Sequence, residues 1–337
     1  MQAERSNIRI AVDAMGGDFA PRNVLTGALD ALKETHNRFE IIFVGQEQLI
    51  RNELKQFHTE GLNLQVVDAS QVIDMQDAAT ATVKQKRDSS ISVGIALHKE
   101  GRADAFVSAG HSGAVMSTAT LILGRIEGIN RPTIGAFLPT VDGFCLLLDA
   151  GANVECKPQH LYEFALMGSI YTKEMFHVSE PKVGLLSIGE EESKGSDLIK
   201  ETHKLLKLSK LNFIGNVEGR DILSGKIDVV VCDGFVGNII LKFGESVPSF
   251  LKNRIKREMG KNYFSKLIGL LVRKILRTAL KSMDYEEYGG VPVLGVNGVT
   301  IIGHGKSTPK AIKNMILRAE EMCMKNINHR IQEALNA

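Results

Sequence analysis

The sequence predicts an α/β protein with an open, mostly parallel sheet sandwiched by helices. Short apolar runs of strand length recur along the chain, and most are apolar throughout, as in strands covered on both faces. Amphipathic stretches of helical length lie between several of these runs. Many runs end in glycine beside an acid, an amide or a hydroxyl, a composition that suits loops at the strand ends of such a sheet. Alternation of this kind is typical of strand–helix–strand units.

The expected elements follow from these runs in chain order. The apolar runs predict strands at residues 8–13, 41–44, 64–67, 105–108, 133–138, 144–149, 183–187, 229–232 and 299–302. The amphipathic stretches predict helices at residues 23–34, 47–59, 89–100 and 161–176. Pro309 suits the first turn of a helix, so residues 310–335 predict one long terminal helix.

Length and composition limit the classes of protein that are possible. A chain of 337 residues can bury a large core, and we expect a single domain over residues 5–330. The net charge of +2 argues against general nucleic-acid binding. Four cysteines show no metal-binding spacing, so we expect no metal site and buried free thiols. The start of the chain has no apolar signal region, and we therefore expect a cytoplasmic protein.

Residues 252–281 depart from the alternating pattern. Their apolar residues follow helical spacing, and their charged residues are almost all basic. A helix packed on the core is the ordinary outcome, but a solvated face normally mixes both signs of charge. A basic amphipathic helix suits an anionic membrane surface or an acidic protein partner, and a core or dimer contact is compatible with either. We expect a protruding docking segment at 250–282, with Leu267, Leu271, Arg273, Lys274 and Arg277 as its contact residues.

The sequence TIIGHGKS at residues 300–307 nearly matches a nucleotide-binding P-loop. Thr300 stands where the motif needs its first glycine, so a nucleotide kinase is not expected. Backbone N–H groups at a helix start, with His304, Lys306 and Ser307, nevertheless predict a site for a single phosphate. The alternative is a helix cap with a solvated lysine. No G-x-G-x-x-G follows a strand, so we expect no nicotinamide cofactor.

Polar residues close two predicted strands in the first half of the chain. Asp13 ends the first strand before a glycine pair, and a carboxylate at the end of a buried strand needs a partner. Asp18 is expected to cap the following helix or to orient a substrate. Ser108 and His111 follow another strand, where the histidine is either a donor to a phosphate or acyl oxygen, or a bystander.

Asp233 and Asn238 form the cluster that most resembles a catalytic site. They follow the predicted strand at 229–232 and are accompanied by two glycines. An asparagine amide and free backbone N–H groups can stabilise an oxyanion as it develops. A Ser-His-Asp triad is not inferred, because the chain has no G-x-S-x-G motif.

Taken together, the clusters resemble the phosphate acyltransferase family, the acyl-carrier-protein (ACP):phosphate transacylases of bacterial phospholipid synthesis. The matching stretches are AVDAMGGDFAP (11–21), KRDSSISVG (86–94), SAGHSGA (108–114), LLLDAGAN (146–153), IGEEESKG (188–195), NVEGRDI (216–222), VVCDGFVGNIILK (230–242), MDYEEYGGVPVLGVNG (283–298) and HGKS (304–307). Two departures stand out. The family usually has Asn-Thr where this chain has His111-Ser112, and commonly asparagine at Ser187.

The resemblance implies a fold like that of isocitrate and isopropylmalate dehydrogenases and of phosphotransacetylase. It implies a homodimer associated peripherally with the inner face of the cell membrane. The implied reaction converts acyl-ACP and inorganic phosphate to acyl-phosphate and free ACP, with no cofactor. A downstream glycerol-3-phosphate acyltransferase would then use the product.

Within that reaction we expect phosphate to attack the thioester directly. A cysteine nucleophile is not expected, because Cys145 and Cys232 lie in apolar strand sequence. Asn238 is expected to bind the thioester oxygen, and Asp233 or Asp13 to orient phosphate or accept its proton. The residues expected to bind phosphate are Lys306, Ser307, His304, Lys194 and Ser108.

Two other functions stay open from the sequence alone. One is a phosphotransacetylase-like enzyme that uses acyl-CoA, which an assay of chain length and carrier would separate. The other is a non-catalytic membrane adaptor that binds acyl-ACP, for which so many polar glycine loops would be unnecessary. A metal-dependent dehydrogenase of the same fold is disfavoured, because the chain has no cofactor motif.

Overall fold

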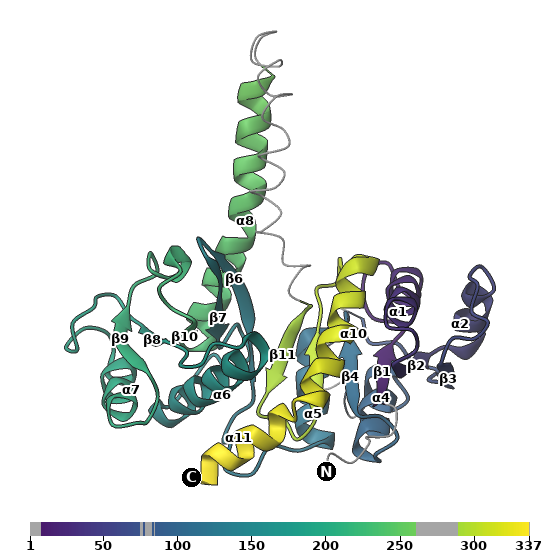
Figure 1. Ribbon diagram of the computed structural model, residues 1–337, viewed down its shortest axis with the longest axis horizontal. Helices are drawn as coiled ribbons and strands as arrows, with labels where there is room; N and C mark the ends of the chain where they lie inside the picture. The colour runs from purple at the N-terminus through teal and green to yellow at the C-terminus, as the bar shows by residue number, and fades with distance from the viewer. Residues whose placement is uncertain (1–7, 75–76, 78–82, 84, 261–288, 337) are drawn as a thin grey trace. The chain divides into compact units, whose positions relative to one another are not determined.

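The computed structural model describes residues 8–74, 77, 83, 85–260 and 289–336, and it confirms the predicted α/β class (Figure 1). Two mostly parallel sheets are each flanked by helices. The chain forms two compact units. Unit 1 comprises Met1–Gly135, Leu166–Ser179 and Tyr288–Ala337, and unit 2 comprises Ala136–Ala165 and Glu180–Glu287.

Unit 1 contains a seven-stranded sheet in the order β3-β2-β1-β4-β12-β11-β5. All neighbouring strands are parallel except β11, which runs antiparallel to both β12 and β5. Because both faces of this sheet are covered, its central strands are apolar throughout, as the sequence predicts. The strands are β1 (Ile8–Asp13), β2 (Phe39–Gly45), β3 (Leu64–Asp68), β4 (Ala105–Ser108), β5 (Thr133–Ile134), β11 (Val291–Leu294) and β12 (Val299–Ile302).

The helices of unit 1 pack on both faces of this sheet. They are α1 (Arg22–Glu34), α2 (Glu47–Leu54), α4 (Ser90–Lys99), α5 (Ser112–Ile122), α10 (Pro309–Met324), α11 (Ile327–Asn336) and the second half of α6 (Pro158–Phe176). The single terminal helix predicted for residues 310–335 is wrong. It breaks between α10 and α11, where Asn326 adopts a left-handed backbone with φ of 51°. Apolar spacing continues across the break, so periodicity alone did not reveal it.

Unit 2 contains a five-stranded sheet in the order β6-β7-β10-β8-β9, parallel except for β6. Its strands are β6 (Ala136–Thr140), β7 (Gly143–Leu148), β8 (Val183–Leu186), β9 (Phe213–Val217) and β10 (Val229–Val231). Its other elements include α7 (Asp197–Lys207), η1 (Ile222–Ser224) and α8 (Gly234–Met259). The first half of α6 also belongs to it.

Four strands, β5, β6, β9 and β11, differ from the sequence prediction. The run at 133–138 forms two strands, because β5 pairs within one sheet and β6 within the other. Strand β9 was missed because it contains Gly215 and Asn216 and has an irregular register with β8. Strand β11 was missed because Pro292, which has no amide hydrogen, interrupts its apolar pattern.

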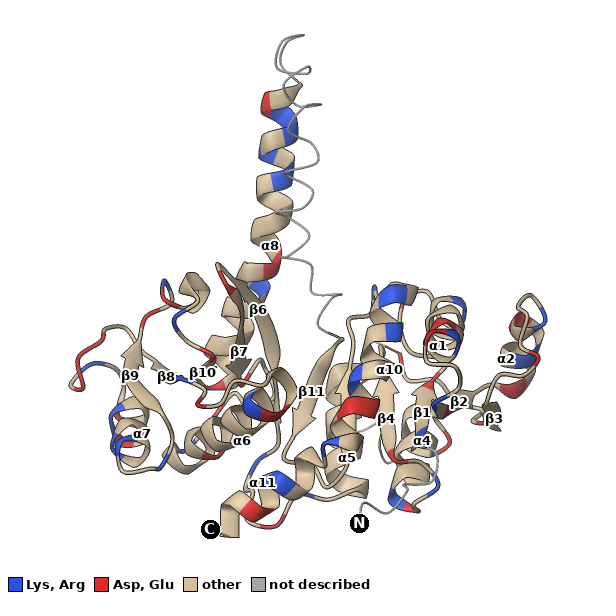
Figure 2. Ribbon diagram, viewed as in Figure 1, with Lys and Arg blue, Asp and Glu red and all other residues tan. Residues whose placement is uncertain are grey.

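Helix α8 begins after β10 and extends beyond the sheet of unit 2 (Figure 1). Its outer half carries Lys252, Arg254, Lys256 and Arg257 against a single acid, Glu258 (Figure 2). The basic character predicted for residues 252–281 therefore begins on a described helix. Apolar side chains on the same helix are exposed, including Phe243 at 71% and Phe250 at 66%.

The contact residues expected for the docking segment, from Leu267 to Arg277, lie outside the described residues. Among the helices that the structure describes, none is both long and apolar enough to span a bilayer.

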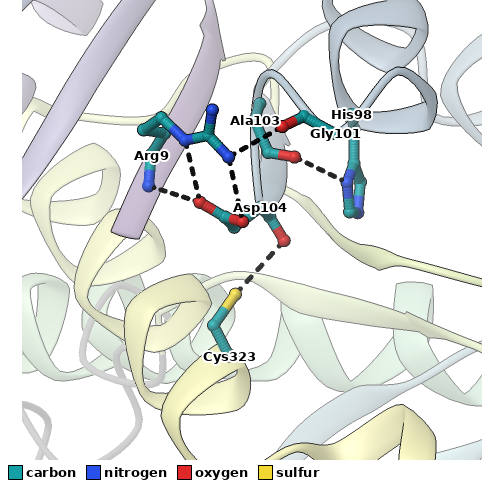
Figure 3. A network of polar contacts seen from close by, with 6 residues as sticks. All are labelled: Arg9, His98, Gly101, Ala103, Asp104 and Cys323. Carbon is teal, nitrogen blue, oxygen red and sulfur yellow. Dashed lines mark hydrogen bonds and ion pairs between the residues drawn. The ribbon is translucent and has the colours of Figure 1, made fainter. Parts of the chain in front are cut away.

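A polar network joins β1, the α4–β4 turn and α10 at the amino-terminal edge of the unit 1 sheet (Figure 3). The backbone and guanidinium of Arg9 donate to the Asp104 carboxylate, with the backbone bond at 2.8 Å. Cys323 Sγ donates to the Asp104 carbonyl at 3.3 Å. His98 Nδ1 lies 3.1 Å from the Ala103 carbonyl, which can only accept, so this nitrogen carries the proton.

Burial lowers the pKa of His98, against smaller opposing effects from its backbone hydrogen bonds and Asp104. The unfolded chain therefore binds a proton at His98 more readily than the folded protein does. We expect the free energy of unfolding to fall as the pH drops through about 6.5, the ordinary histidine pKa. The replacement His98→Asn should keep a donor to Ala103 and flatten this dependence in urea titrations at pH 7.5 and 5.5. The exposed His329→Asn serves as the control, and an equal slope in both variants would contradict the assignment.

Candidate active site

In unit 1, three polar loops meet at one edge of the sheet. Strands β1, β4 and β12 are parallel neighbours, so their carboxyl ends lie side by side. The chain runs outward from β1 through β2 to β3 and then returns to the other side of β1 as β4. Strand order therefore reverses between β1 and β4, and ligands of open α/β sheets bind at such a switch point.

Asp13 and Ser108 meet at this switch point, as the strand-end pattern suggests. Ser108 Oγ donates to Asp13 Oδ2 at 2.6 Å, and the Met15 amide donates to Asp13 Oδ1 at 3.1 Å. Asp13 is only 1% exposed, and burial raises the pKa of its carboxyl against hydrogen bonds from Ser108 and Ser90. Ser90, at the start of α4, was missed by the sequence analysis, although it lies within the quoted stretch KRDSSISVG. A buried carboxyl with a raised pKa is suited to exchanging a proton.

A glycine is required at position 16 by the close packing around Asp13. A Cβ atom on Gly16 would overlap Asp13 Oδ2 and would lie 2.8 Å from the Gly110 nitrogen. The Gly110 amide donates to Ser108 Oγ at 3.0 Å. The Ser108 hydroxyl thus both donates to Asp13 and accepts from Gly110, so its observed contacts orient the carboxylate.

His111 lies at the same edge, as the N-cap of α5. Its Nδ1 accepts from the Ala114 amide at 3.2 Å. A neutral ring that accepts through Nδ1 carries its proton on Nε2, so His111 has an N–H available for donation. This geometry is compatible with both sequence interpretations, helix cap and ligand donor.

The loop between β12 and α10 brings His304 and Lys306 to this edge. Lys306 is exposed, and its backbone amide donates to His304 Nδ1 at 3.1 Å. Ser307 is buried, and its hydroxyl donates to the His304 carbonyl at 2.6 Å, so that hydroxyl braces the loop. Thr308 caps α10 by accepting from the Ala311 amide.

The first loop contacts the last one directly. The Asp18 amide donates to the Gly305 carbonyl at 2.7 Å. Gly17 has a φ of +104°, and a Cβ atom there would lie 3.0 Å from the same carbonyl oxygen. The prediction that Asp18 caps the next helix is wrong, because Pro21 is the N-cap of α1 and Asp18 instead lies beside Gly305.

Unit 2 has a second polar edge, built around Asp149 after β7. Its carboxylate accepts from the backbone amides of Gly151, Ala152 and Asn153 and from the Asn153 side chain, at 2.6–3.1 Å. Asp149 is fully buried, and burial raises the pKa of its carboxyl against these hydrogen bonds. The sequence analysis did not include Asp149 among the candidate residues. The stretch LLLDAGAN could have indicated it, because an acid there ends a buried strand just before a glycine.

Helix α8 starts against this loop and carries Asp233 at its N-cap and Asn238 in its first turns. Asp233 is its N-cap, with Oδ1 accepting from the Val236 amide at 2.9 Å. Asn238 is exposed in the first turns of the helix, and a Cβ atom on Gly151 would lie 3.2 Å from Asn238 Cβ. Asp233 therefore organises the helix start, and Asn238 presents its amide beside the Gly151 loop. Their catalytic roles stay predictions.

The glycine at 237 is where this loop and helix approach most closely. A Cβ atom on Gly237 would overlap the Asp149 carbonyl oxygen, which is backbone. We expect Gly237→Ala to lower the free energy of unfolding by about 1–3 kcal/mol, as overpacking does. The matched control is Gly244→Ala on the same helix, where the nearest atom is a Leu138 methyl at 3.6 Å and alanine should not destabilise. Equal denaturation midpoints for both variants would refute this packing account.

The candidate residues are thus divided between the units. Unit 1 holds Asp13, Ser108 and His111 with the loop at 304–307, and unit 2 holds Asp233, Asn238 and Lys194. Burial raises the pKa of the Cys145 and Cys232 thiols, which disfavours the thiolate that a nucleophilic cysteine needs. Among the described residues, no cluster of three or more His, Cys, Asp or Glu side chains is arranged to hold a metal ion.

Comparison with known proteins shows the family to which the chain belongs. A family model described as "Fatty acid synthesis protein" matches residues 8–330. A phosphate acyltransferase of Chlorobaculum parvum is 47% identical, over 98% of this chain and 99% of its own. One from Thermodesulfovibrio yellowstonii is 48% identical, over 98% and 94%. The crystal structure of a phosphotransacetylase from Streptococcus pyogenes superposes with a TM-score of 0.65 at 20% identity, covering 94% of each chain, and thus shares the fold.

The family is established by the sequence matches, because both relatives are well above 30% identical over nearly the whole chain. The expected phosphotransacetylase-like fold is confirmed by the structural match. The chain belongs to the phosphate acyltransferase family, and it is an acyltransferase enzyme.

Proposed function

We propose that this enzyme transfers a fatty acyl group from acyl-ACP to inorganic phosphate, giving acyl-phosphate and free ACP. The observation that carries the proposal is the convergence of polar loops after β1, β4 and β12, with the exposed Lys306 at their edge. The names of the relatives support phosphate as acceptor, and the family's description supports a fatty acyl donor.

The chemistry needs no covalent enzyme intermediate. A phosphate oxygen attacks the thioester carbon, a new C–O bond forms, and the C–S bond breaks as the carrier thiolate leaves. The proton lost by hydrogen phosphate can pass to the departing sulfur. Phosphate is a weak nucleophile, so positioning and oxyanion stabilisation supply most of the catalysis.

In unit 1, we assign phosphate binding to Lys306, His304 and His111. Lysine supplies a positive charge, and His111 can donate from Nε2, which bonds to none of the residues that the structure describes. The starts of α5 and α10 add backbone N–H groups. Ser307 and Ser108 support this arrangement through their bonds to His304 and Asp13. Asp13, buried with a raised pKa, is the residue suited to orient phosphate or take its proton.

In unit 2, we assign the thioester oxygen to Asn238. Its amide lies near the start of α8, where the helix dipole favours developing negative charge. Asp233 and Asp149 hold the helix start and the facing loop in place. We further propose that Lys194 contributes to phosphate binding from its own loop.

The partners follow from the same proposal. Basic residues at the outer end of α8, with exposed Phe243 and Phe250, favour contact with acidic ACP, an anionic membrane or a second copy of the chain. We propose a homodimer that associates peripherally with the inner face of the membrane and delivers acyl-phosphate to a glycerol-3-phosphate acyltransferase.

The direct test is incubation of the purified enzyme with palmitoyl-ACP, with and without phosphate, followed by mass spectrometry. Phosphate-dependent formation of acyl-phosphate and free ACP is expected. Activity only with short acyl-CoA would favour a phosphotransacetylase-like reaction, for which the shared fold is the specific support. ACP binding without turnover would favour an adaptor and refute the proposed reaction.

A further inference from the structure

The loop after β8 carries a lysine among several acids. Residues 188–195 include three consecutive glutamates and then Lys194, all exposed. Glu192 pairs with Lys207 Nζ at 2.6 Å, and Glu190 lies 3.8 Å from Arg220. Lys194 forms no ion pair with any residue that the structure describes. Two of the acids are therefore paired with side chains outside the loop. The third, Glu191, lies beside Lys194 without an ion pair to any described residue, since a Cβ atom on Gly189 would be 2.9 Å from Glu191 Oε2 and 3.0 Å from Lys194 Cγ. Among the described acids of the loop, an anion would therefore have to compete only with Glu191 for the lysine.

A buried asparagine holds the backbone of this loop. Asn216, on β9, is 5% exposed, and its Nδ2 donates to the Glu191 carbonyl at 3.0 Å. The same carbonyl accepts from the Lys194 amide at 3.0 Å. The Glu191 carbonyl thus accepts from both the Asn216 side chain and the Lys194 backbone. The position of Asn216 therefore helps to fix the backbone at Lys194.

A buried histidine fixes the orientation of that asparagine. His203, on α7, is also 5% exposed, and its Nδ1 lies 2.9 Å from Asn216 Oδ1. Because the asparagine uses its NH2 group on Glu191, its oxygen must face the histidine, so Nδ1 carries the proton. On the other side, His203 Nε2 lies 3.5 Å from Glu192 Oε1, and Phe213 packs edge-on against the ring. The imidazole therefore joins α7, β9 and the loop.

We propose that Asn216 and His203 are positioning residues that hold the loop at 188–195 so that Lys194 can bind the phosphate substrate. The inference deepens the proposed function and rests on it. A flexible lysine on an unsupported loop loses conformational freedom when it binds, and a loop already fixed in place lowers that cost. Asn216 bonds to the backbone of the loop and not to the lysine side chain. Losing that bond should therefore change phosphate binding only by displacing Lys194.

The test is a double-mutant cycle on phosphate affinity. Asn216→Asp keeps the oxygen facing His203 and removes the donor to Glu191. We expect it to raise the KM for phosphate about tenfold or more with a smaller change in kcat, as displaced positioning groups do. In a Lys194→Ala background the same substitution should add little, because the residue through which it acts is gone. A purely structural role would give equal effects in both backgrounds and would overturn the proposal.

A second asparagine beside β9 provides the matched control. Asn212, near the other end of β9, donates from Nδ2 to the Glu180 carbonyl at 3.0 Å, and Asn212→Asp should leave the KM unchanged. If Asn216→Asp fails to fold, His203→Leu takes its place in the double-mutant cycle. That substitution removes the bond that orients the Asn216 side chain. Calorimetry with inorganic phosphate repeats the cycle without turnover. If the wild-type protein makes no acyl-phosphate, the proposed function is wrong. If phosphate affinity is unchanged by Asn216→Asp or by Lys194→Ala, the role proposed for the loop is wrong.

Discussion

Asn238→Ala should lower kcat about a hundredfold or more, the usual cost of losing one donor to an oxyanion. The amide belongs to the first turns of α8 and lies beside the Gly151 loop, and it is exposed rather than part of the core. Its loss should therefore reduce turnover without changing the free energy of unfolding. The measurement is steady-state release of free ACP from palmitoyl-ACP at saturating phosphate.

Ser246→Ala provides the matched control for Asn238→Ala. Ser246 lies on the same helix and is exposed, and its hydroxyl donates to the Phe243 carbonyl one turn back. Its replacement should leave kcat within about twofold, as a neutral surface change does. If a folded Asn238→Ala protein turns over at the wild-type rate, Asn238 has no part in stabilising the oxyanion.

Lys306→Ala should raise the KM for phosphate about ten- to a hundredfold, since a hydrogen bond to a charged group contributes about 1.5–3 kcal/mol. The side chain is exposed at the β12–α10 loop, whose backbone is held by Ser307 and His304 without it. The loop should therefore keep its conformation in the variant. Initial rates over a range of phosphate concentrations, at fixed palmitoyl-ACP, measure the effect.

The control for this change is Lys313→Ala, farther along α10. Lys313 pairs with Glu34 of α1 at 2.5 Å, so its side chain is directed to α1. Lys313→Ala removes the same charge at a position seven residues further along the chain, on α10 itself. Any general electrostatic effect on phosphate should therefore appear in both variants. Equal KM values for the two variants would show that Lys306 has no specific contact with phosphate.

The sequence predicted much of the fold because apolar runs and amphipathic stretches reflect burial directly. Strands β1, β2, β4 and β12 were all predicted within about two residues, since each is buried on both faces. Strands β9 and β11 were not predicted, because Gly215, Asn216 and Pro292 interrupt their apolar pattern. These segments become strands by pairing with β8 and β12. The left-handed Asn326 that divides the terminal helix likewise leaves no gap in apolar spacing.

The candidate site was predicted in residue types more than in roles. Strand ends carrying Asp13, Ser108 and His111 were expected to be polar, and the parallel order of β1, β4 and β12 places them at one edge. The serine hydroxyls, however, prove to be engaged with Asp13 and with the His304 carbonyl. Residue types indicate that a site is polar. Which partner each hydroxyl bonds to depends on how the chain folds around it.

What the sequence determined by itself is the α/β class, the position of the glycine loops and the family, because each is written in local composition, spacing and motif. Tertiary structure alone decided that the Asn216 side chain reaches the Glu191 carbonyl. It alone decided which polar loops share one sheet and which belong to the other. The reason is physical: partners such as Asp13 and Ser108 are 95 residues apart, and only strand order brings them within hydrogen-bonding distance.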